Sequence, residues 1–244
     1  MQLDRAVVYK SAGQRLAWLI HYLKVRFKHK EKNRVLAMSR HFHENSIVID
    51  VGAHFGYLTK EFARAYNGNT NVIAFEPVEY CYSILKRIVR NLPNVKIEKL
   101  ALFDNESVVK IKIPIKKSGH LGIGLSHFGE EKNRDFISEE IKTITLDSYL
   151  EQNHLDRLDF IKIDVEGSEL HVLHGAKKTL TIFRPIIYLE IDESMTARMN
   201  YQPDDIWLYL SQFNYKSFLM DKNGELSEIQ KYSGTNDYLF KFNS

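Results

Sequence analysis

The sequence predicts an α/β fold with a mostly parallel central sheet and a C-terminal antiparallel strand pair. Two stretches, residues 47–63 and 158–180, each contain an apolar run, a glycine turn and a segment of helical periodicity. Further apolar runs alternate with helical patterns, which is typical of parallel strands joined by crossover helices. Near the end of the chain, residues 215–220 and 236–242 have strand patterns with a turn at 221–224 between them, which predicts the antiparallel pair.

Length and composition indicate one globular protein. A chain of 244 residues is long enough for one sizeable α/β domain, and its 44% hydrophobic and 27% charged residues are ordinary for a soluble protein. No apolar run approaches the roughly 18 residues of a membrane span, and the first residues lack the apolar stretch of a signal peptide. Cys81 is the only cysteine, which excludes an internal disulfide. We therefore expect a cytoplasmic protein.

Positive charge is concentrated in the first 46 residues, which hold ten lysines and arginines against three acidic residues. A set of apolar residues at helical spacing precedes most of these cations, namely Leu16, Leu19, Ile20, Leu23 and Phe27. We divide the chain into an N-terminal basic amphipathic helical segment, residues 1–45, and a second unit, residues 46–244.

Two interpretations of the N-terminal segment remain open. The helix could dock on an anionic surface, either membrane headgroups or a lipid-linked phosphorylated glycan, so that it makes peripheral membrane contact. Alternatively it covers an edge of the sheet and leaves its cations in solvent, which is the interpretation we favour. Nucleic acid is not an expected partner, because aromatic and basic residues do not interleave on any predicted strand.

The first glycine turn indicates the kind of ligand. Its strand ends at Asp50, and Gly52, Ala53 and Gly56 follow. A dinucleotide-binding turn would have a glycine in place of Asp50, since an acid there repels pyrophosphate. An acid suits an ammonium group instead, and S-adenosylmethionine carries an ammonium and a sulfonium but no phosphate. Ordinary turn chemistry at a buried strand is the simpler alternative.

The next two strands end in residues that complete such a site. Residues 72–75 are followed by Glu76 and Pro77, about 20 residues beyond the glycine turn, where a carboxylate can accept both hydroxyls of a ribose. Pro77 ends the strand and keeps the acid at its tip. We predict a third strand over residues 95–102, with Ala101 and Leu102 beside the adenine. A surface acid placed by chance is the alternative for Glu76.

Candidate catalytic residues follow the strand over residues 158–163. Asp164 and Glu166 lie at its tip, where one carboxylate can deprotonate a substrate hydroxyl and the pair can hold Mg²⁺. His120 is a reserve general base, in a glycine-rich stretch over residues 116–138 that we expect to be a loop. We also expect Asp147 to cap the N-terminus of a helix over residues 148–152.

The order and spacing of these motifs resemble the FkbM family of S-adenosylmethionine-dependent methyltransferases. The resemblance runs from about Ser46 to Asp192. Its motifs are Asp50-x-Gly52-Ala53-x-x-Gly56-x-x-Thr59, Phe75-Glu76-Pro77, Ala101-Leu102-x-Asp104, Thr143-x-Thr145-Leu146-Asp147, Lys162-Ile163-Asp164-Val165-Glu166-Gly167, Gly175-Ala176 and Pro185-x-x-x-Leu189-Glu190.

The resemblance implies a Rossmann-like class I methyltransferase fold and O-methylation of a hydroxyl, usually on a sugar, glycan, glycolipid or other natural product. It implies cofactor contacts from the glycine turn, the second strand, the third strand and the transfer site: Asp50, Gly52, Ala53, His54, Gly56, Tyr57, Glu76, Pro77, Ala101, Leu102 and Asp164. His54 stands where the family commonly has asparagine. The alternatives are a non-catalytic Rossmann-like binding protein and, less favoured because of Asp50, an NAD-dependent oxidoreductase.

Overall fold

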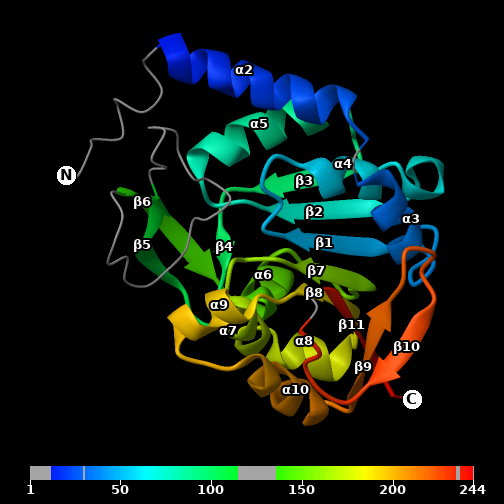
Figure 1. The fold of residues 1–244 in the computed structure, drawn as a ribbon. Helices are drawn as coiled ribbons and strands as arrows, with labels where there is room; N and C mark the ends of the chain where they lie inside the picture. The colour runs from blue at the N-terminus through cyan, green and yellow to red at the C-terminus, as the bar shows by residue number, and fades with distance from the viewer. Residues whose placement is uncertain (1–11, 30, 115–135, 235–236, 244) are drawn as a thin grey trace.

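The computed structural model describes residues 12–29, 31–114, 136–234 and 237–243, which form two sheets with helices packed around the larger one (Figure 1). The larger sheet has eight strands in the order β10-β9-β11-β8-β7-β1-β2-β3. Its strands are β1 Ile47–Val51, β2 Asn71–Phe75, β3 Val95–Glu98, β7 Phe160–Ile163, β8 Ile186–Glu190, β9 Tyr215–Met220, β10 Leu226–Ile229 and β11 Asp237–Phe242.

The helices that flank this sheet fall into an early and a late group along the chain. The early group is α2 Ala12–Phe27, α3 Lys32–Ser39, α4 Tyr57–Phe62 and α5 Glu79–Val89. The late group is α6 Leu146–Gln152, α7 Glu169–His174, α8 Lys177–Ile182, α9 Glu193–Thr196 and α10 Pro203–Ser211. Figure 1 shows α2, α4 and α5 in the upper part of the view and α7, α8 and α10 in the lower part, with β1 and β7 between them.

Alternate residues of the central strands explain why both faces need helices. On β1, Ile49 and Val51 join a core cluster with side chains of α6, α7, α8 and α10, whereas Val48 joins a cluster with α3 and α4. All of the strand β7 is buried. Strands covered on both faces are near-continuously apolar, and this is the pattern of parallel sheets.

The predicted fold class is confirmed. Strands β3, β2, β1, β7 and β8 are parallel neighbours, and β11 and β9 continue the sheet antiparallel. The predicted C-terminal pair is present as β9 and β11, with Tyr238 opposite Leu219. One additional strand was not predicted: β10 pairs with β9 from Leu226, so the turn after Met220 joins β9 to β10.

The prediction of one strand over residues 95–102 was wrong. The chain leaves the larger sheet after Glu98, and Ala101–Leu102 forms β4 of a separate sheet with the order β4-β6-β5. In that sheet β5 is Ser107–Pro114 and β6 is Phe136–Ile144. Strand β6 begins inside the stretch expected to be a loop, and residues 116–135 of that stretch lie outside the described residues.

The expected cap at Asp147 was also wrong. Helix α6 begins at Leu146, two residues earlier than expected, and its N-cap is Thr145, whose hydroxyl accepts a hydrogen bond from the Ser148 N–H at 3.0 Å. The Asp147 carboxylate instead serves the start of α8. It accepts from the N–H groups of Lys178 and Thr179, both at 2.8 Å, and from the Thr179 hydroxyl at 2.6 Å.

The N-terminal helices pack on the rest of the chain. Val25 of α2 is fully buried. Val35 and Met38 of α3 join the core cluster that contains Val48 of β1. Arg34 of α3 donates to Glu190 at 2.8 Å and to Asp237 at 2.7 Å, which ties this helix to β8 and β11. A boundary at residue 46 stays a prediction.

Asp147→Ala should lower the free energy of unfolding by about 1–2 kcal/mol, because three donors at the start of α8 lose their acceptor. Urea unfolding followed by circular dichroism measures this change. The control is Asp156→Ala, which removes the same charge from an exposed position. Equal stability of the two variants would show that the Asp147 contacts contribute nothing.

Candidate functional site

The carboxyl ends of three neighbouring strands converge on one pocket. Val51 at the end of β1 is paired with Phe75 of β2 on one side and with Ile163 of β7 on the other. The segments that follow these residues therefore leave the sheet side by side, which is where ligands bind in open α/β sheets. They enclose a cavity of about 240 Å³.

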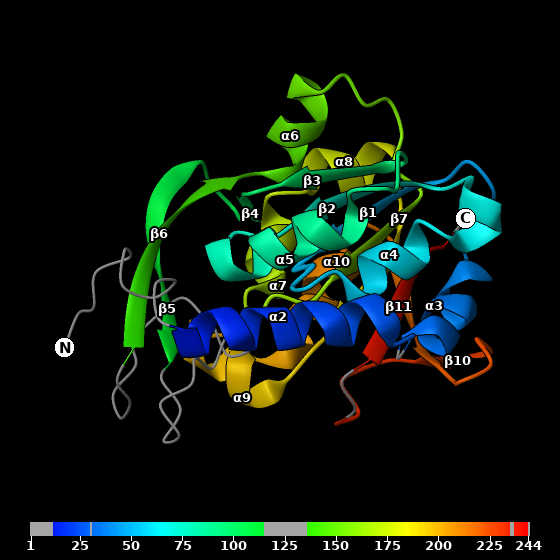
Figure 2. The same ribbon diagram turned by 90° about the horizontal axis from the view of Figure 1, so that it is seen from above.

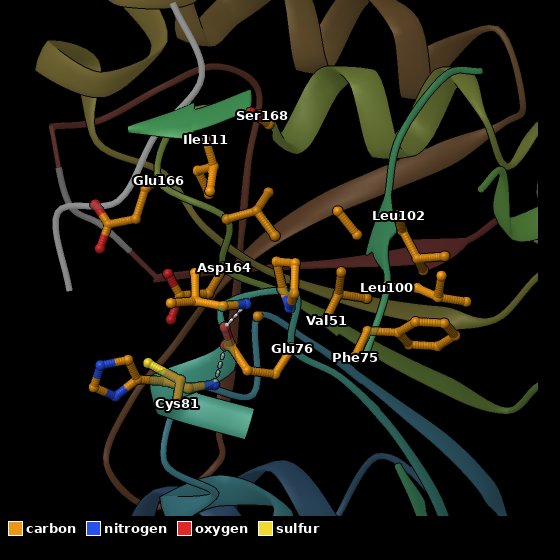
Figure 3. A pocket seen from close by; sticks show the side chains of 16 residues that line it. Val51, Phe75, Glu76, Cys81, Leu100, Leu102, Ile111, Asp164, Glu166 and Ser168 are labelled. Carbon is orange, nitrogen blue, oxygen red and sulfur yellow. Dashed lines mark hydrogen bonds between the residues drawn. The ribbon is translucent and has the colours of Figure 1, made fainter. Parts of the chain in front are cut away.

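The cavity has an apolar and an acidic side. Figure 3 shows Phe75, Leu100 and Leu102 gathered at one side, Asp164 and Glu166 toward the other, and Glu76 between them. Further apolar contact comes from a second set of side chains, Val78, Cys81 and Ile111. Three carboxylates in so small a space favour a ligand with positive charge or many donors.

Gly52 makes the close approach of β1 and β7 possible. Its φ is +73°, in the left-handed region, and a Cβ there would lie 1.9 Å from the backbone oxygen of Asp164. The N–H groups of Gly52 and Ala53 both donate to the Phe75 carbonyl, at 3.1 and 3.0 Å. Any side chain at position 52 would push the acidic side of the pocket away from the glycine turn.

Glu76 is held by backbone donors. One oxygen accepts from the His54 N–H at 2.8 Å and the other from the Val78 N–H at 2.9 Å, the two bonds drawn in Figure 3. Burial raises the pKa of Glu76 to about 7, although these two hydrogen bonds favour the ionised form. The carboxylate is fixed in orientation, and each oxygen keeps capacity to accept from a bound diol.

Lys162 is the charged centre beneath the pocket. Its ammonium lies 3.2 Å from Asp50 and 3.4 Å from Asp164, and it donates to the carbonyls of Val51 and Gly52 at 3.1 and 2.9 Å. Burial opposes its charged form, but the two carboxylates outweigh burial and raise its pKa. The Asp50 contact is an ion pair without hydrogen-bond alignment, since that Asp50 oxygen has no hydrogen-bond partner.

Asp50 itself faces inward. Its side chain is fully buried, and its other oxygen accepts from the Thr59 hydroxyl at 2.6 Å. Lys162 pairs with the Asp50 carboxylate, which we expected to bind the ammonium group of a ligand. Asp50 therefore fixes α4 and Lys162 relative to β1, and Asp164 is the aspartate of this group that lines the pocket.

Glu166 borders a second recess of about 80 Å³ that adjoins the first. The acids around it include Asp164, Glu169, Glu190 and Asp192. Burial and then the charge of Asp164 raise the pKa of Glu166 to about 8. Its φ of +54° is rare for a residue with a side chain, and it directs the turn into Gly167. A carboxyl group with this pKa can exchange protons near neutral pH.

Two buried polar atoms of the pocket lining have no hydrogen-bond partner within the described residues, His54 Nε2 and Ser168 Oγ. Burial lowers the pKa of His54 to about 4, so its ring is neutral and offers one donor or acceptor at that atom. Buried polar atoms cost free energy unless a partner satisfies them. Together with Glu76 and the acidic side, they fit a ligand with an apolar ring, a diol and a cationic group, as S-adenosylmethionine has.

The structure divides the sequence-predicted residues into two sets. Those that line the pocket are Gly52, His54, Glu76, Pro77, Ala101, Leu102, Asp164 and Glu166. Four others support it from behind: Asp50 through Lys162, Ala53 and Tyr57 through apolar packing, and Gly56 as the left-handed N-cap of α4. Direct cofactor contact by the residues of either set stays a prediction, and His120 lies outside the described residues.

Sequence reasoning overlooked Lys162 and Ser168. A signal for Lys162 was present, because it interrupts the apolar run Phe160–Ile163 in a strand that must be buried on both faces. A buried lysine needs a partner, and acids follow directly. Ser168 carries no such signal. Among the residues that the structure describes, no group of three or more potential ligand side chains is placed to hold a metal, and the Mg²⁺ site stays a prediction.

The sequence matches a model of one protein family, the methyltransferase FkbM domain, over residues 50–217. This chain belongs to the FkbM methyltransferase domain family. The match starts at Asp50 and includes the glycine turn, Glu76 and the segment from Lys162 to Gly167. The resemblance found in the sequence is therefore confirmed.

Two curated relatives and a solved structure are similar to this methyltransferase domain. Methyltransferase sdnD of Sordaria araneosa is 26% identical, over 54% of this chain and 60% of that protein. Methyltransferase 1 of Beauveria bassiana is 25% identical, over 55% and 59%. The chain thus spans about 60% of the length of these relatives. An O-methyltransferase from Bacillus cereus, in complex with SAH, is 14% identical with a TM-score of 0.47, covering 96% of this chain and 92% of that one.

Lys162→Met should lower the free energy of unfolding by about 3–5 kcal/mol, because it leaves the buried Asp50 carboxylate without its cation. Asp50→Asn/Lys162→Met should cost clearly less than the sum of the two single changes, since both members of the pair become neutral. Denaturant unfolding of the wild type, both single variants and the double variant measures this coupling.

A matched control is Lys96→Met, at an exposed lysine that pairs with Glu98 at 3.0 Å. It should change stability by less than about 1 kcal/mol. If the Asp50 and Lys162 changes were additive, the ion pair would not be the interaction that holds the pocket floor.

Proposed function

We propose that this protein is an S-adenosylmethionine-dependent O-methyltransferase that acts on a hydroxyl of a sugar in a glycan, glycolipid or natural product. One observation carries the proposal: Glu76 is held by two backbone N–H groups between an apolar and an acidic side of one pocket. Membership of the FkbM methyltransferase family supports the reaction class. The single cysteine agrees with the cytoplasmic location that we propose.

The pocket residues suit the parts of this cofactor. Leu102 and Phe75 give apolar contact for an adenine ring, and Glu76 can accept from the ribose hydroxyls. Asp164 and the neutral His54 lie on the acidic side, where the ammonium and sulfonium of the methionine portion are favoured. S-adenosylmethionine supplies an electrophilic methyl group when it is bound.

The chain's own residues then have two tasks. Glu166 borders both the pocket and the neighbouring recess, so its carboxylate can accept the proton of an acceptor hydroxyl. Asp164, fixed by Lys162, can orient the same hydroxyl. The acceptor oxygen would gain the methyl group as the carbon–sulfur bond breaks and S-adenosylhomocysteine leaves as a neutral thioether, and the hydroxyl proton would pass to Glu166. Positioning of the acceptor contributes several kcal/mol to lowering the barrier.

The recess favours a polyhydroxylated acceptor. Its acidic side chains Glu190 and Asp192 present carboxylate oxygens beside Glu166, and carboxylates accept hydrogen bonds from sugar hydroxyls. Both acids keep capacity to accept further hydrogen bonds beside their contacts with Arg34 and Ser194. We therefore propose a small-molecule or glycan acceptor with several hydroxyl groups.

S-adenosylhomocysteine should raise the thermal stability of the wild type, because it binds the folded protein. At about 100 times its dissociation constant it adds about 2.7 kcal/mol. Glu76→Ala should remove most of this gain, while the exposed control Glu106→Ala should keep it. Thermal unfolding with and without the ligand is the measurement. Absence of any stabilisation in a folded wild type contradicts the proposal, and stabilisation by NAD alone would favour an oxidoreductase.

Turnover should depend on the ionisation of Glu166. Because its pKa is raised to about 8, only about one tenth of the carboxyl groups are ionised at pH 7. The rate should therefore rise with pH and level off above about 8. Glu166→Gln should lower kcat by about 10²–10⁴-fold and abolish this rise. Steady-state rates across pH, with S-adenosylhomocysteine formation as the signal, measure both effects.

The matched control is Asp192→Asn, in the same recess but engaged with Ser194 at 2.5 Å. It should retain the rise with pH. A Glu166→Gln variant with the wild-type rate and pH profile would assign the proton transfer to another group.

A further inference from the structure

Helix α2 is fixed to the molecule along one face. The indole N–H of Trp18 donates to the Ser83 hydroxyl of α5 at 2.8 Å, and Val25 is fully buried. At the C-terminal end of α2, the ammonium of Lys60 donates to the carbonyls of Val25 and Lys28. Figure 2 shows α2 lying alongside α5, on the outer side of the early helices. The helix therefore has a defined inner and outer face.

The outer face of α2 is apolar. Its large hydrophobic side chains remain exposed by 42–72%: Leu16, Leu19, Ile20, Leu23 and Phe27. At about 100° per residue these five lie within about 100° of the helix circumference, opposite Val25. They are half of the ten large exposed hydrophobic side chains among the described residues, and the others are spread over several elements. We call these five residues the outer stripe.

Cations border the outer stripe on both sides. By the same helical geometry, Arg15 and Arg26 lie along one edge and Lys24 along the other, and all three are exposed. Long basic side chains can extend their charges to phosphate groups while their stems stay beside apolar surface. An apolar stripe with cations along both edges is the pattern of a helix that lies in the interface of an anionic bilayer.

We propose that α2 is a membrane-docking helix that lies in the headgroup region of an anionic bilayer. The charge pattern favours a bilayer over a second copy of this chain. In a dimer through this face, the cations of the two copies would face and repel one another. No helix in the described ranges is long and apolar enough to cross a membrane, so the contact is peripheral. The favoured sequence interpretation, a solvated cationic outer face, does not account for the apolar stripe.

Docking through α2 would also hold the pocket at a defined position relative to the membrane surface. The inner-face residues Trp18 and Tyr22 pack against an apolar cluster that includes Val78, Cys81 and Ile111, which line the cavity. One apolar cluster thus joins the docking helix to the pocket wall. Membrane binding itself requires no methyl transfer, so it is independent of the proposed function.

The test is co-sedimentation of the full chain with vesicles of phosphatidylcholine, with and without phosphatidylglycerol. We expect binding to the anionic vesicles that weakens with added salt. Leu19→Gln/Leu23→Gln/Phe27→Gln should weaken it at least about tenfold, since three inserted apolar side chains are lost. The control is Val108→Gln/Ile182→Gln/Leu208→Gln, three side chains exposed by 63–65% on other elements, which should bind like the wild type.

The cations are tested separately. Lys24→Gln/Arg26→Gln should weaken binding roughly 25-fold, at roughly fivefold for each cation near the surface. Lys222→Gln/Lys231→Gln removes the same net charge from other exposed positions and should leave binding unchanged. All four variants should keep the melting temperature of the wild type, because the changed side chains are exposed.

Three results would overturn the proposal. One is equal binding of the wild type to neutral and anionic vesicles, or none to either. Another is an equal loss of binding in a control variant and its test variant. The last is a lipid-free dimer in light scattering that the outer-stripe variant converts to a monomer, which would make a second copy the occupant.

Discussion

The buried ammonium of Lys162 is the interaction on which the pocket depends. It joins the end of β1 to the end of β7 through Asp50, Asp164 and two carbonyls of the glycine turn. A charge fully out of water is tolerated only with close partners of opposite sign. Because those partners come from both strands, the position of each segment is set by the other. Gly52 is the complementary constraint, since it leaves room for the Asp164 backbone to approach.

This arrangement gives one pocket two chemical environments. Lys162 offsets the charge of Asp50 and Asp164, whereas Glu76 and Glu166 remain without a cation in contact among the described ion pairs. Burial therefore raises the pKa of both, to about 7 and about 8. Glu76 is fixed by backbone donors as a binding group, and Glu166 lies where pocket and recess meet. The two acids can thus serve different roles within one small space.

Much of the fold could be predicted because its signals are local. The buried strand Ile47–Val51, its glycine turn and the acid at the tip of β2 follow from hydrophobic pattern and turn chemistry within a few residues. The convergence of Gly52, Glu76 and Asp164 follows from parallel strand order. The same local reasoning failed at residues 95–102, because the departure of β4 to a second sheet depends on pairing with Thr143 and Ile144, about 40 residues away.

The sequence by itself determined the parallel sheet, the glycine turn and the set of acids at the strand ends, since these depend on residue type and short spacing. Only the tertiary structure decided what each acid faces. Asp50 and Asp164 both contact Lys162, yet Asp50 is fully buried and Asp164 lines the pocket. Likewise the five apolar residues of α2 predict a helix, but their exposure depends on which face α5 covers. Burial and partners are properties of packing between distant segments, and no local pattern contains them.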